Sequence, residues 1–186
     1  PDIQIGLEEF IYYFNNKTYS NLTVAATAAN LQMNIDTLET ATLQPFNTYR
    51  YRTTDVQLSA DYSVTRKFNA RHLLKGGVLV KHFVLNYNER NFSDSFQVYF
   101  QTLDEKGNTS MVQTYVQYQF RPHPRLTLNN GLYYQRLFLN GSQALEPRMG
   151  AAWQLSETHR LGLAYGLHSQ TMPLAMYYLK FYNSTT

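Results

Sequence analysis

Apolar and polar residues alternate without exception over residues 55–65, and this alternation restricts the fold more than any other feature of the sequence. One register holds only apolar side chains: Val56, Leu58, Ala60, Tyr62 and Val64. The other holds only polar ones: Asp55, Gln57, Ser59, Asp61, Ser63 and Thr65. Successive side chains of a β-strand point to opposite faces, whereas a helix with about 3.6 residues per turn would mix the two sets. The pattern therefore predicts a strand with one apolar face and one polar face.

The same alternation recurs along the chain and predicts six antiparallel strands, at 55–65, 72–86, 110–120, 126–135, 146–155 and 160–168. The second is the least regular, because Leu73, Leu79, Phe83 and Leu85 share a register with Lys75 and Lys81. Each strand has about ten to fifteen residues, against five or six in a typical soluble strand. Roughly ten tilted residues are enough to cross a bilayer. The predicted fold class is all-β, with strands long enough for an antiparallel transmembrane β-barrel.

The connections favour the barrel over a soluble β-sandwich. Short polar turns at 66–71, 121–125 and 156–159 all fall at one end of the sheet, and the longer connection at 87–109, with a turn signal at 104–108, falls at the other. Outer-membrane barrels have this asymmetry. The polar registers are also rich in Gln, Asn, Ser, Thr and Gly, as expected for a crowded polar lumen. A soluble sandwich that binds carbohydrate or protein remains the alternative.

Composition excludes several classes of function. The net charge is only +3, from 16 basic and 13 acidic residues, which argues against a nucleic-acid partner. The absence of cysteine excludes a disulfide scaffold and a thiolate metal site. The five histidines have no metal-ligand spacing, and Ser169 next to His168 would face the opposite side of a strand. No run of eighteen apolar residues predicts a transmembrane helix. We therefore expect neither an enzyme nor a cofactor or metal site.

Specific residue runs carry a resemblance to a known family. They are the strand at 145–155, which begins Leu-Glu-Pro-Arg-Met-Gly, and the strand at 161–170, which reads Leu-Gly-Leu-Ala-Tyr-Gly-Leu-His-Ser-Gln and is followed by Pro173. The run at 125–134 precedes them. This part of the chain resembles the β-barrel of TonB-dependent outer-membrane receptors that carry a carboxypeptidase-regulatory-like domain before the plug. The resemblance is most specific over 110–178 and looser over 50–88.

The resemblance implies a 22-stranded barrel in the outer membrane of a Gram-negative bacterium. It also implies an N-terminal plug and the import of a scarce solute, such as a metal chelate or a glycan, with energy relayed by the TonB complex. Expected partners are outer-membrane lipid, the TonB complex through the plug, and a small solute or glycan. Six to eight strands are too few for that barrel, so residues 1–186 are expected to be an internal part of one larger barrel domain.

Two groups of residues are candidate sites. Glu146 and Arg148 share a strand face, and His168 on the next strand is expected to lie across from Arg148, with Gln170 beyond it. We expect these four side chains to line the lumen and contact the plug, and an ion pair without a role in transport is an equally good explanation. Aromatic residues are candidates for the extracellular substrate mouth: Phe92, Phe96, Tyr99, Tyr177 and Tyr178. Interfacial anchoring is the favoured explanation for these rings.

Further elements are expected outside the six strands. Residues 6–14 are predicted as one more strand, and the alanine-rich stretch 22–43 as the site of a short helix. Residues 96–101 alternate again and are predicted to extend a hairpin outward.

Overall fold

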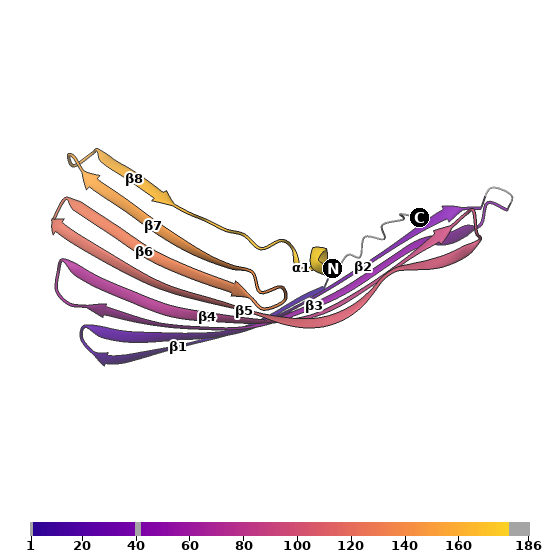
Figure 1. Ribbon diagram of the computed structural model, residues 1–186, viewed down its shortest axis with the longest axis horizontal. Coiled ribbons are helices and arrows are strands. Elements are labelled where there is room, and N and C mark those ends of the chain that lie inside the picture. Colours follow the sequence, from indigo (N-terminus) through magenta and orange to yellow (C-terminus); the bar gives the residue numbers. More distant parts are fainter. Residues whose placement is uncertain (1, 40–41, 179–186) are drawn as a thin grey trace.

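The computed structural model describes residues 2–39 and 42–178, which form one antiparallel sheet of eight strands in chain order (Figure 1). The strands are β1 (Asp2–Asn15), β2 (Thr18–Leu38), β3 (Pro45–Lys67), β4 (His72–Ser93), β5 (Val98–His123), β6 (Leu126–Leu137), β7 (Gln143–Gln154) and β8 (Arg160–Gly166). A five-residue helix, α1 (Leu174–Tyr178), follows. The sheet is not closed into a barrel: β1 and β8 form its two edges. The all-β prediction is confirmed, and the six predicted strands correspond to β3 to β8, although the last two predictions, 146–155 and 160–168, extend one and two residues beyond the observed ends of β7 and β8.

Two predictions for the N-terminal part have different outcomes. The predicted strand at 6–14 is confirmed and belongs to β1, but the predicted helix within 22–43 is wrong, because residues 18–38 form β2. Alanine is the best helix former, and here it occurs in both strand registers, which hides the alternation. Pairing with β1 and β3 on both sides satisfies the backbone of β2 and overrides that local preference.

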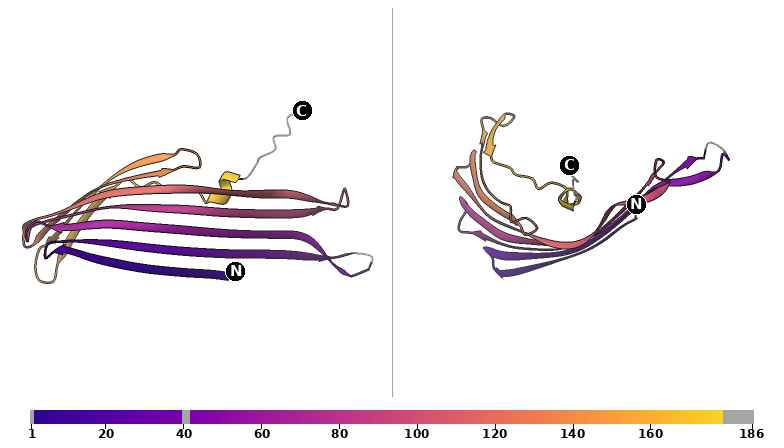
Figure 2. Two further views of the ribbon diagram at one scale, coloured as in Figure 1. Left: turned by 90° about the horizontal axis from the view of Figure 1, so that it is seen from below. Right: turned by 45° about the vertical axis from the view of Figure 1, so that its right-hand side comes forward.

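The predicted long loop at 87–109 is also wrong. Strand β4 continues to Ser93 and β5 begins at Val98, so only 94–97 form the turn. The predicted turn at 104–108 lies inside β5, where Asp104 pairs with Asn88 and Asn108 with Val84. The outward hairpin extension predicted at 96–101 is confirmed. Strands β2 to β5 thus project well beyond the hairpin of β6 and β7, and this projecting part is called the extension (Figure 2).

The sheet is strongly curved, and α1 with the segment before it lies over the concave face (Figures 1 and 2). Leu85, Tyr87 and Leu103 form a buried cluster on that face, against which Phe83 and Leu174 pack. This cluster accounts for the apolar residues Phe83 and Leu85 in the inward register of β4, whereas Leu73 and Leu79 of the same register line other parts of the concave face. Within the described residues, no helix is both long and apolar enough to cross a membrane.

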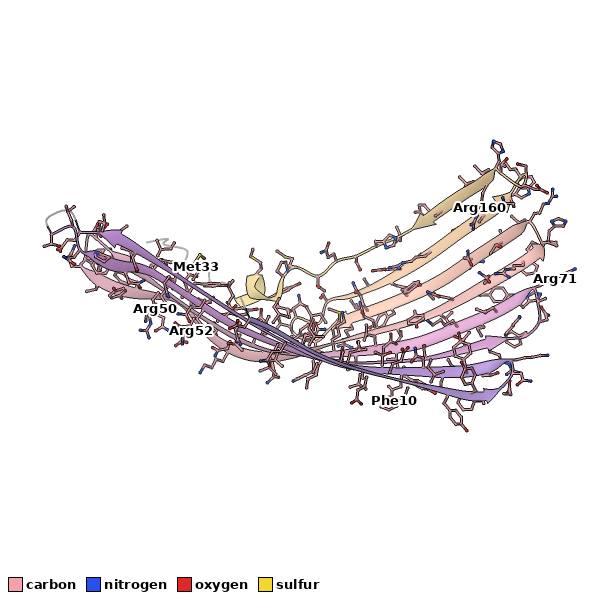
Figure 3. All side chains as sticks on the ribbon, turned by 180° about the vertical axis from the view of Figure 1, so that it is seen from behind. Phe10, Met33, Arg50, Arg52, Arg71 and Arg160 are labelled. Carbon is pink, nitrogen blue, oxygen red and sulfur yellow. The ribbon has the colours of Figure 1, made fainter. Side chains whose placement is uncertain are left out.

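The convex face carries an apolar belt. Directly paired residues of neighbouring strands share a face, so the register defines it. The belt consists of alternate residues within 10–14, 22–28, 56–64, 74–84, 112–120, 126–134, 145–153 and 161–165, interrupted only at Gly76, His82, Thr114 and Asn130. Figure 3 shows Phe10 on this convex side and Met33 on the concave side. The belt ends abruptly on entering the extension, where Asn30, Thr54 and Asn86 continue the same face.

Much of the belt is uncovered. Leu163 and Leu145 are 69% and 58% exposed, and only five hydrophobic residues are buried among those described. The accessible surface is 13711 Å². A compact monomer of 21.7 kDa would expose roughly 9,200 Å². The sheet therefore presents a large apolar surface that no other described part of the chain covers.

The position of the belt shifts steadily from strand to strand. It begins at Val56 in β3 and at Leu145 in β7. Leu145 is connected to Tyr62 of β3 through successive directly paired residues in β6, β5 and β4. Tyr62 lies six residues beyond Val56, so the upper edge of the belt shifts by six residues between β3 and β7. A flat apolar slab crossed by tilted strands produces such a stagger, as in the wall of a barrel.

Candidate functional site

The concave face carries a row of two tyrosines between two cations. Each member comes from a different strand: Lys75 from β4, Tyr115 from β5, Tyr133 from β6 and Arg148 from β7. The Lys75 Nζ lies 5.8 Å from the centre of the Tyr115 ring. The Tyr115 and Tyr133 rings are stacked with 5.7 Å between their centres. The Arg148 Cζ lies 4.0 Å from the centre of the Tyr133 ring. This cation–tyrosine stack lays flat rings across the inner wall.

Glycines beside the stack, at 77, 131 and 166, provide the space that it needs. Gly77 lies directly opposite Tyr115, and a Cβ added to Gly77 would lie 2.8 Å from the tyrosine ring. A Cβ at Gly131 would lie 3.0 Å from the Tyr133 ring. A Cβ at Gly166 would lie 3.1 Å from the Arg148 Cγ. An aromatic ring packed over a strand glycine also covers the backbone groups that glycine, which has no side chain, would leave exposed to water.

Glu146 joins the end of this row to the segment after β8. Its Oε2 accepts a hydrogen bond from the Arg148 Nη2 at 2.6 Å, within an ion pair. Its Oε1 accepts hydrogen bonds from the Ser169 backbone N–H at 2.9 Å and from the Ser169 hydroxyl at 2.5 Å. The Gln135 Nε2 donates to the same serine Oγ at 2.6 Å. Glu146 is only 5% exposed, so the bonds that its carboxylate accepts are largely sheltered from water.

The segment held by Glu146 crosses the concave face. Residues 167–173, called the strap, leave the edge of the sheet at β8 and end at α1 (Figure 1). The Leu167 N–H donates to the Pro147 carbonyl at 3.1 Å, and Leu174 packs against the cluster of Leu85, Tyr87 and Leu103. The strap is therefore fixed by polar contacts at Ser169 and by apolar contacts at Leu174.

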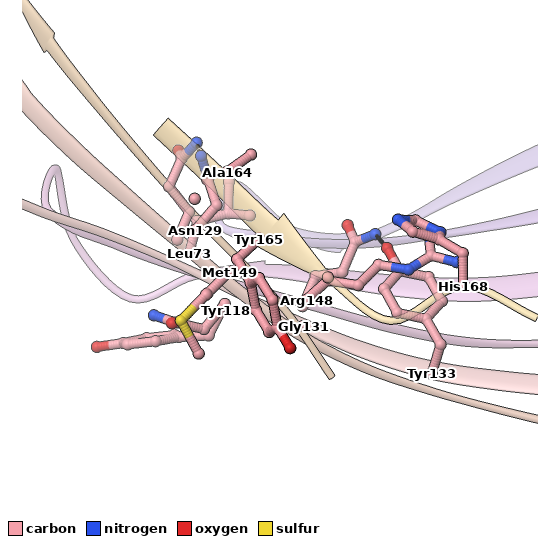
Figure 4. A pocket seen from close by; sticks show the side chains of 15 residues that line it. Leu73, Tyr118, Asn129, Gly131, Tyr133, Arg148, Met149, Ala164, Tyr165 and His168 are labelled. Carbon is pink, nitrogen blue, oxygen red and sulfur yellow. Dashed lines mark hydrogen bonds between the residues drawn. The ribbon is translucent and has the colours of Figure 1, made fainter. Parts of the chain in front are cut away.

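A groove of about 520 Å³ runs beside the stack. Its concave-face lining includes Gln117, Gln119, Asn129, Arg148 and His168, and Figure 4 shows Arg148, Tyr133 and His168 gathered at one end. Gln119 donates to Asn129 at 3.1 Å. The Arg148 Nε is buried and has no hydrogen-bond partner. Such a wall offers amide groups and one guanidinium to a polar ligand or to another polar protein surface.

The four residues that were predicted to line the lumen do not all lie together in the structure. Glu146 and Arg148 share the concave face and form the predicted ion pair. His168 does not lie across the ladder from Arg148 as predicted, because β8 ends at Gly166 and that glycine is the partner of Arg148. His168 lies in the strap and lines the groove with Arg148. Gln170 lines a separate, smaller hollow with Gln135 and Tyr177. Contact with a plug stays a prediction.

The predicted mouth aromatics fall into separate places. Phe92 and Tyr99 pair at the tip of the extension, with ring centres 5.1 Å apart, and Phe46 packs edge-on against Phe92 at 4.5 Å. Phe96 lies in the turn and contacts Phe100. Tyr177 belongs to α1 over the concave face and lines a hollow with Met111 and Leu137, away from the tip. The side chain of Tyr178 lies outside the described residues. A substrate mouth formed by these rings stays a prediction.

Sequence reasoning missed the stack and the role of Ser169. Lys75, Tyr115 and Tyr133 become neighbours only through the register of two strand pairs, β4 with β5 and β5 with β6. Glycines within otherwise regular strands, at 77 and 131, were the available signal that a ring packs over the backbone. Ser169 was considered only as a nucleophile beside His168, and the structure uses it as a donor to Glu146.

Comparison with known proteins adds no family. No protein-family model matches the chain, and no curated protein matches it significantly. Among the described residues, no group of His, Cys, Asp or Glu side chains is arranged to hold a metal ion. Function must therefore be inferred from the two faces of the sheet.

Proposed function

We propose that this chain forms part of the wall of a TonB-dependent outer-membrane transporter, which imports a scarce solute such as a metal chelate or a glycan. The apolar belt on the convex face is the observation that carries the proposal. The belt would face lipid, and the polar concave face would face the lumen.

The dimensions of the belt suit a membrane. In β3 it runs from Val56 to Val64, which is roughly 27 Å along the strand at 3.3 Å per residue, or about 20 Å of height at a tilt near 40°. The apolar bands of outer-membrane barrels are about 25 Å tall. His82 interrupts the belt, and its Nδ1 lies 2.9 Å from the Ser110 Oγ, so this polar group is partnered within the sheet.

The two ends of the sheet suit opposite sides of a membrane. The turns at 16–17, 68–71, 124–125 and 155–159 close one end directly below the belt. At the other end the extension is polar on its convex face, as expected for strands that continue into water. By analogy with known barrels, the short turns would face the periplasm and the extension the exterior.

The concave face suits a lumen that must bind and release polar groups. It presents amides, the cation–tyrosine stack and the groove beside Arg148. The family assignment itself depends on the resemblance at 145–155 and 161–170, and the transported solute would be set by parts of the extension.

Fractionation of the source cells tests the proposal. An antibody against this segment should detect an outer-membrane protein of roughly 75 kDa or more, the mass of a full set of strands and their loops. It should resist extraction by alkaline carbonate and require detergent. A soluble protein of about the mass of this chain would contradict the proposal and favour a binding module whose belt is covered by a second sheet. If cells that lack the TonB complex contain as much of the outer-membrane protein as normal cells and still take up the solute at the same rate, only the transport mechanism would be contradicted.

A further inference from the structure

We propose that the convex face of the extension binds the phosphorylated headgroup of a glycolipid in the outer leaflet, through Arg50, Arg52 and Arg90. This inference rests on the proposed function, because it requires that the belt lie in the membrane with the extension outside. The supporting observations are the position of these arginines, their exposure and their lack of acidic partners.

The arginines lie on the same face as the belt and just beyond its edge. The register places Arg52 beside Asn88, and Arg50 directly opposite Arg90. Figure 3 shows Arg50 and Arg52 on the convex side, the side of Phe10. Lys106, which pairs with Asn86, adds a fourth exposed cation to the face. The patch therefore continues the surface that lipid would cover.

Its height matches a headgroup. Arg52 lies four residues beyond Val56, roughly 13 Å along the strand, and Arg50 and Arg90 lie six residues beyond the belt, roughly 20 Å. A tilt near 40° reduces these to about 10 and 15 Å above the hydrocarbon edge. Phospholipid headgroups occupy only about 5 to 8 Å on each side. A phosphorylated saccharide headgroup extends further and can reach both levels.

The charges of the patch are not compensated within the described residues. Asp104 is its one acidic neighbour on this face, and that carboxylate accepts a hydrogen bond from Asn88 at 3.2 Å. Arg52 donates only to the Gln32 amide at 3.3 Å. The guanidinium groups of Arg50 and Arg90 have no hydrogen bond or ion pair in the part of the chain that the structure describes. Like charges directly opposite each other destabilise a strand pair, and a phosphate between two guanidinium groups would remove that repulsion.

The test compares lipid retention by the full-length protein reconstituted in phosphatidylcholine nanodiscs that contain lipid A. Native mass spectrometry would count the lipid A molecules bound to the wild type, to Arg50→Gln/Arg90→Gln and to a control, Arg71→Gln/Arg160→Gln. The control removes the same charge from exposed arginines at the short-turn end (Figure 3). We expect the Arg50/Arg90 variant to bind lipid A about twenty-five-fold more weakly, at about fivefold per arginine, and the control to bind like the wild type.

Three results would overturn the inference. They are equal retention by the wild type and the Arg50/Arg90 variant, equal retention of dephosphorylated lipid A, and displacement of lipid A by an equal concentration of inorganic phosphate. The last would identify a site for small anions. A wild-type protein that fails to insert into nanodiscs would overturn the proposed function as well, whereas insertion with unchanged retention would overturn the lipid site alone.

Discussion

At the scale of single residues, neighbours in one strand should respond oppositely to polar substitution. Leu163 lies on the belt in β8, and Gly162 lies on the concave face with no atom within 4 Å of where its Cβ would be. We expect Leu163→Arg to lower the free energy of unfolding in lipid vesicles by about 2 to 4 kcal/mol, because a charge would enter hydrocarbon. Gly162→Ser, the matched control, should change it by less than about 0.5 kcal/mol. Urea titration followed by electrophoretic mobility measures both, and equal effects would contradict the lipid-facing orientation.

The space over Gly77 provides a second residue-scale prediction. A methyl group there would lie 2.8 Å from Tyr115 and would displace its ring from the cation–tyrosine stack. We expect Gly77→Ala to destabilise the protein by about 1 to 3 kcal/mol, as overpacking does elsewhere. Gly162→Ala should be neutral or slightly stabilising, since its surroundings are open. The two variants share the same change in strand propensity, so a similar free energy of unfolding would show that the stack does not depend on the glycine.

Of the candidate site, the sequence allowed only the contact between two residues of the same strand to be predicted. Glu146 and Arg148 are two residues apart in a strand, which placed them on one face, and their ion pair followed. Ser169 lies in a segment whose path no periodicity describes. The stack requires Tyr115 to meet Tyr133 across a pair whose register is set by the whole hairpin. Local patterns do not contain that information.

At the scale of elements, the strap should loosen when its polar attachment is removed. The Ser169 hydroxyl donates to a buried carboxylate, a type of hydrogen bond that contributes about 1.5 to 3 kcal/mol. We expect Ser169→Ala to speed amide hydrogen exchange over 167–173 about tenfold, while β7 stays protected. Ser156→Ala removes a hydroxyl that bonds only within the turn at 155–159, and it should leave the strap unchanged. Unchanged exchange in the Ser169 variant would mean that the backbone hydrogen bonds of Leu167 and Ser169, together with the packing of Leu174, are enough to hold the strap.

The strands were predictable where their two faces meet different surroundings. Strand β3 alternates strictly along the belt, where its convex register is apolar and its concave register is polar. Beyond residue 86, β4 and β5 carry polar residues in both registers, so the sequence shows no alternation there and predicts a loop. Strand β2 shows no clear alternation because alanine occurs on both of its faces. In both places the hydrogen bonds to neighbouring strands, rather than the side chains, determine the structure.

At the scale of the whole molecule, the sheet is organised around surfaces more than around a core. The buried cluster of Leu85, Tyr87 and Leu103 is small, and the largest apolar area is the uncovered belt. Its position shifts steadily from strand to strand, its lower edge lies at the short turns, and its upper edge is followed by polar residues and then by arginines. These features are independent of one another in sequence, and the membrane-spanning orientation that we propose would account for all of them together.

Trp153 tests that orientation directly, because it is the only tryptophan of the chain. It lies on the belt near the short-turn end and is 52% exposed. In vesicles made with brominated phospholipids, its fluorescence should be quenched strongly, and more by bromines near the headgroup than by bromines at the chain ends, since tryptophan prefers the interface. Aqueous iodide should quench it weakly. Subtracting the spectrum of Trp153→Phe would isolate this signal if the complete protein has other tryptophans. Strong iodide quenching with no effect of brominated lipid would place the belt in water or against protein, and the lipid-facing assignment would then fail for all eight strands at once.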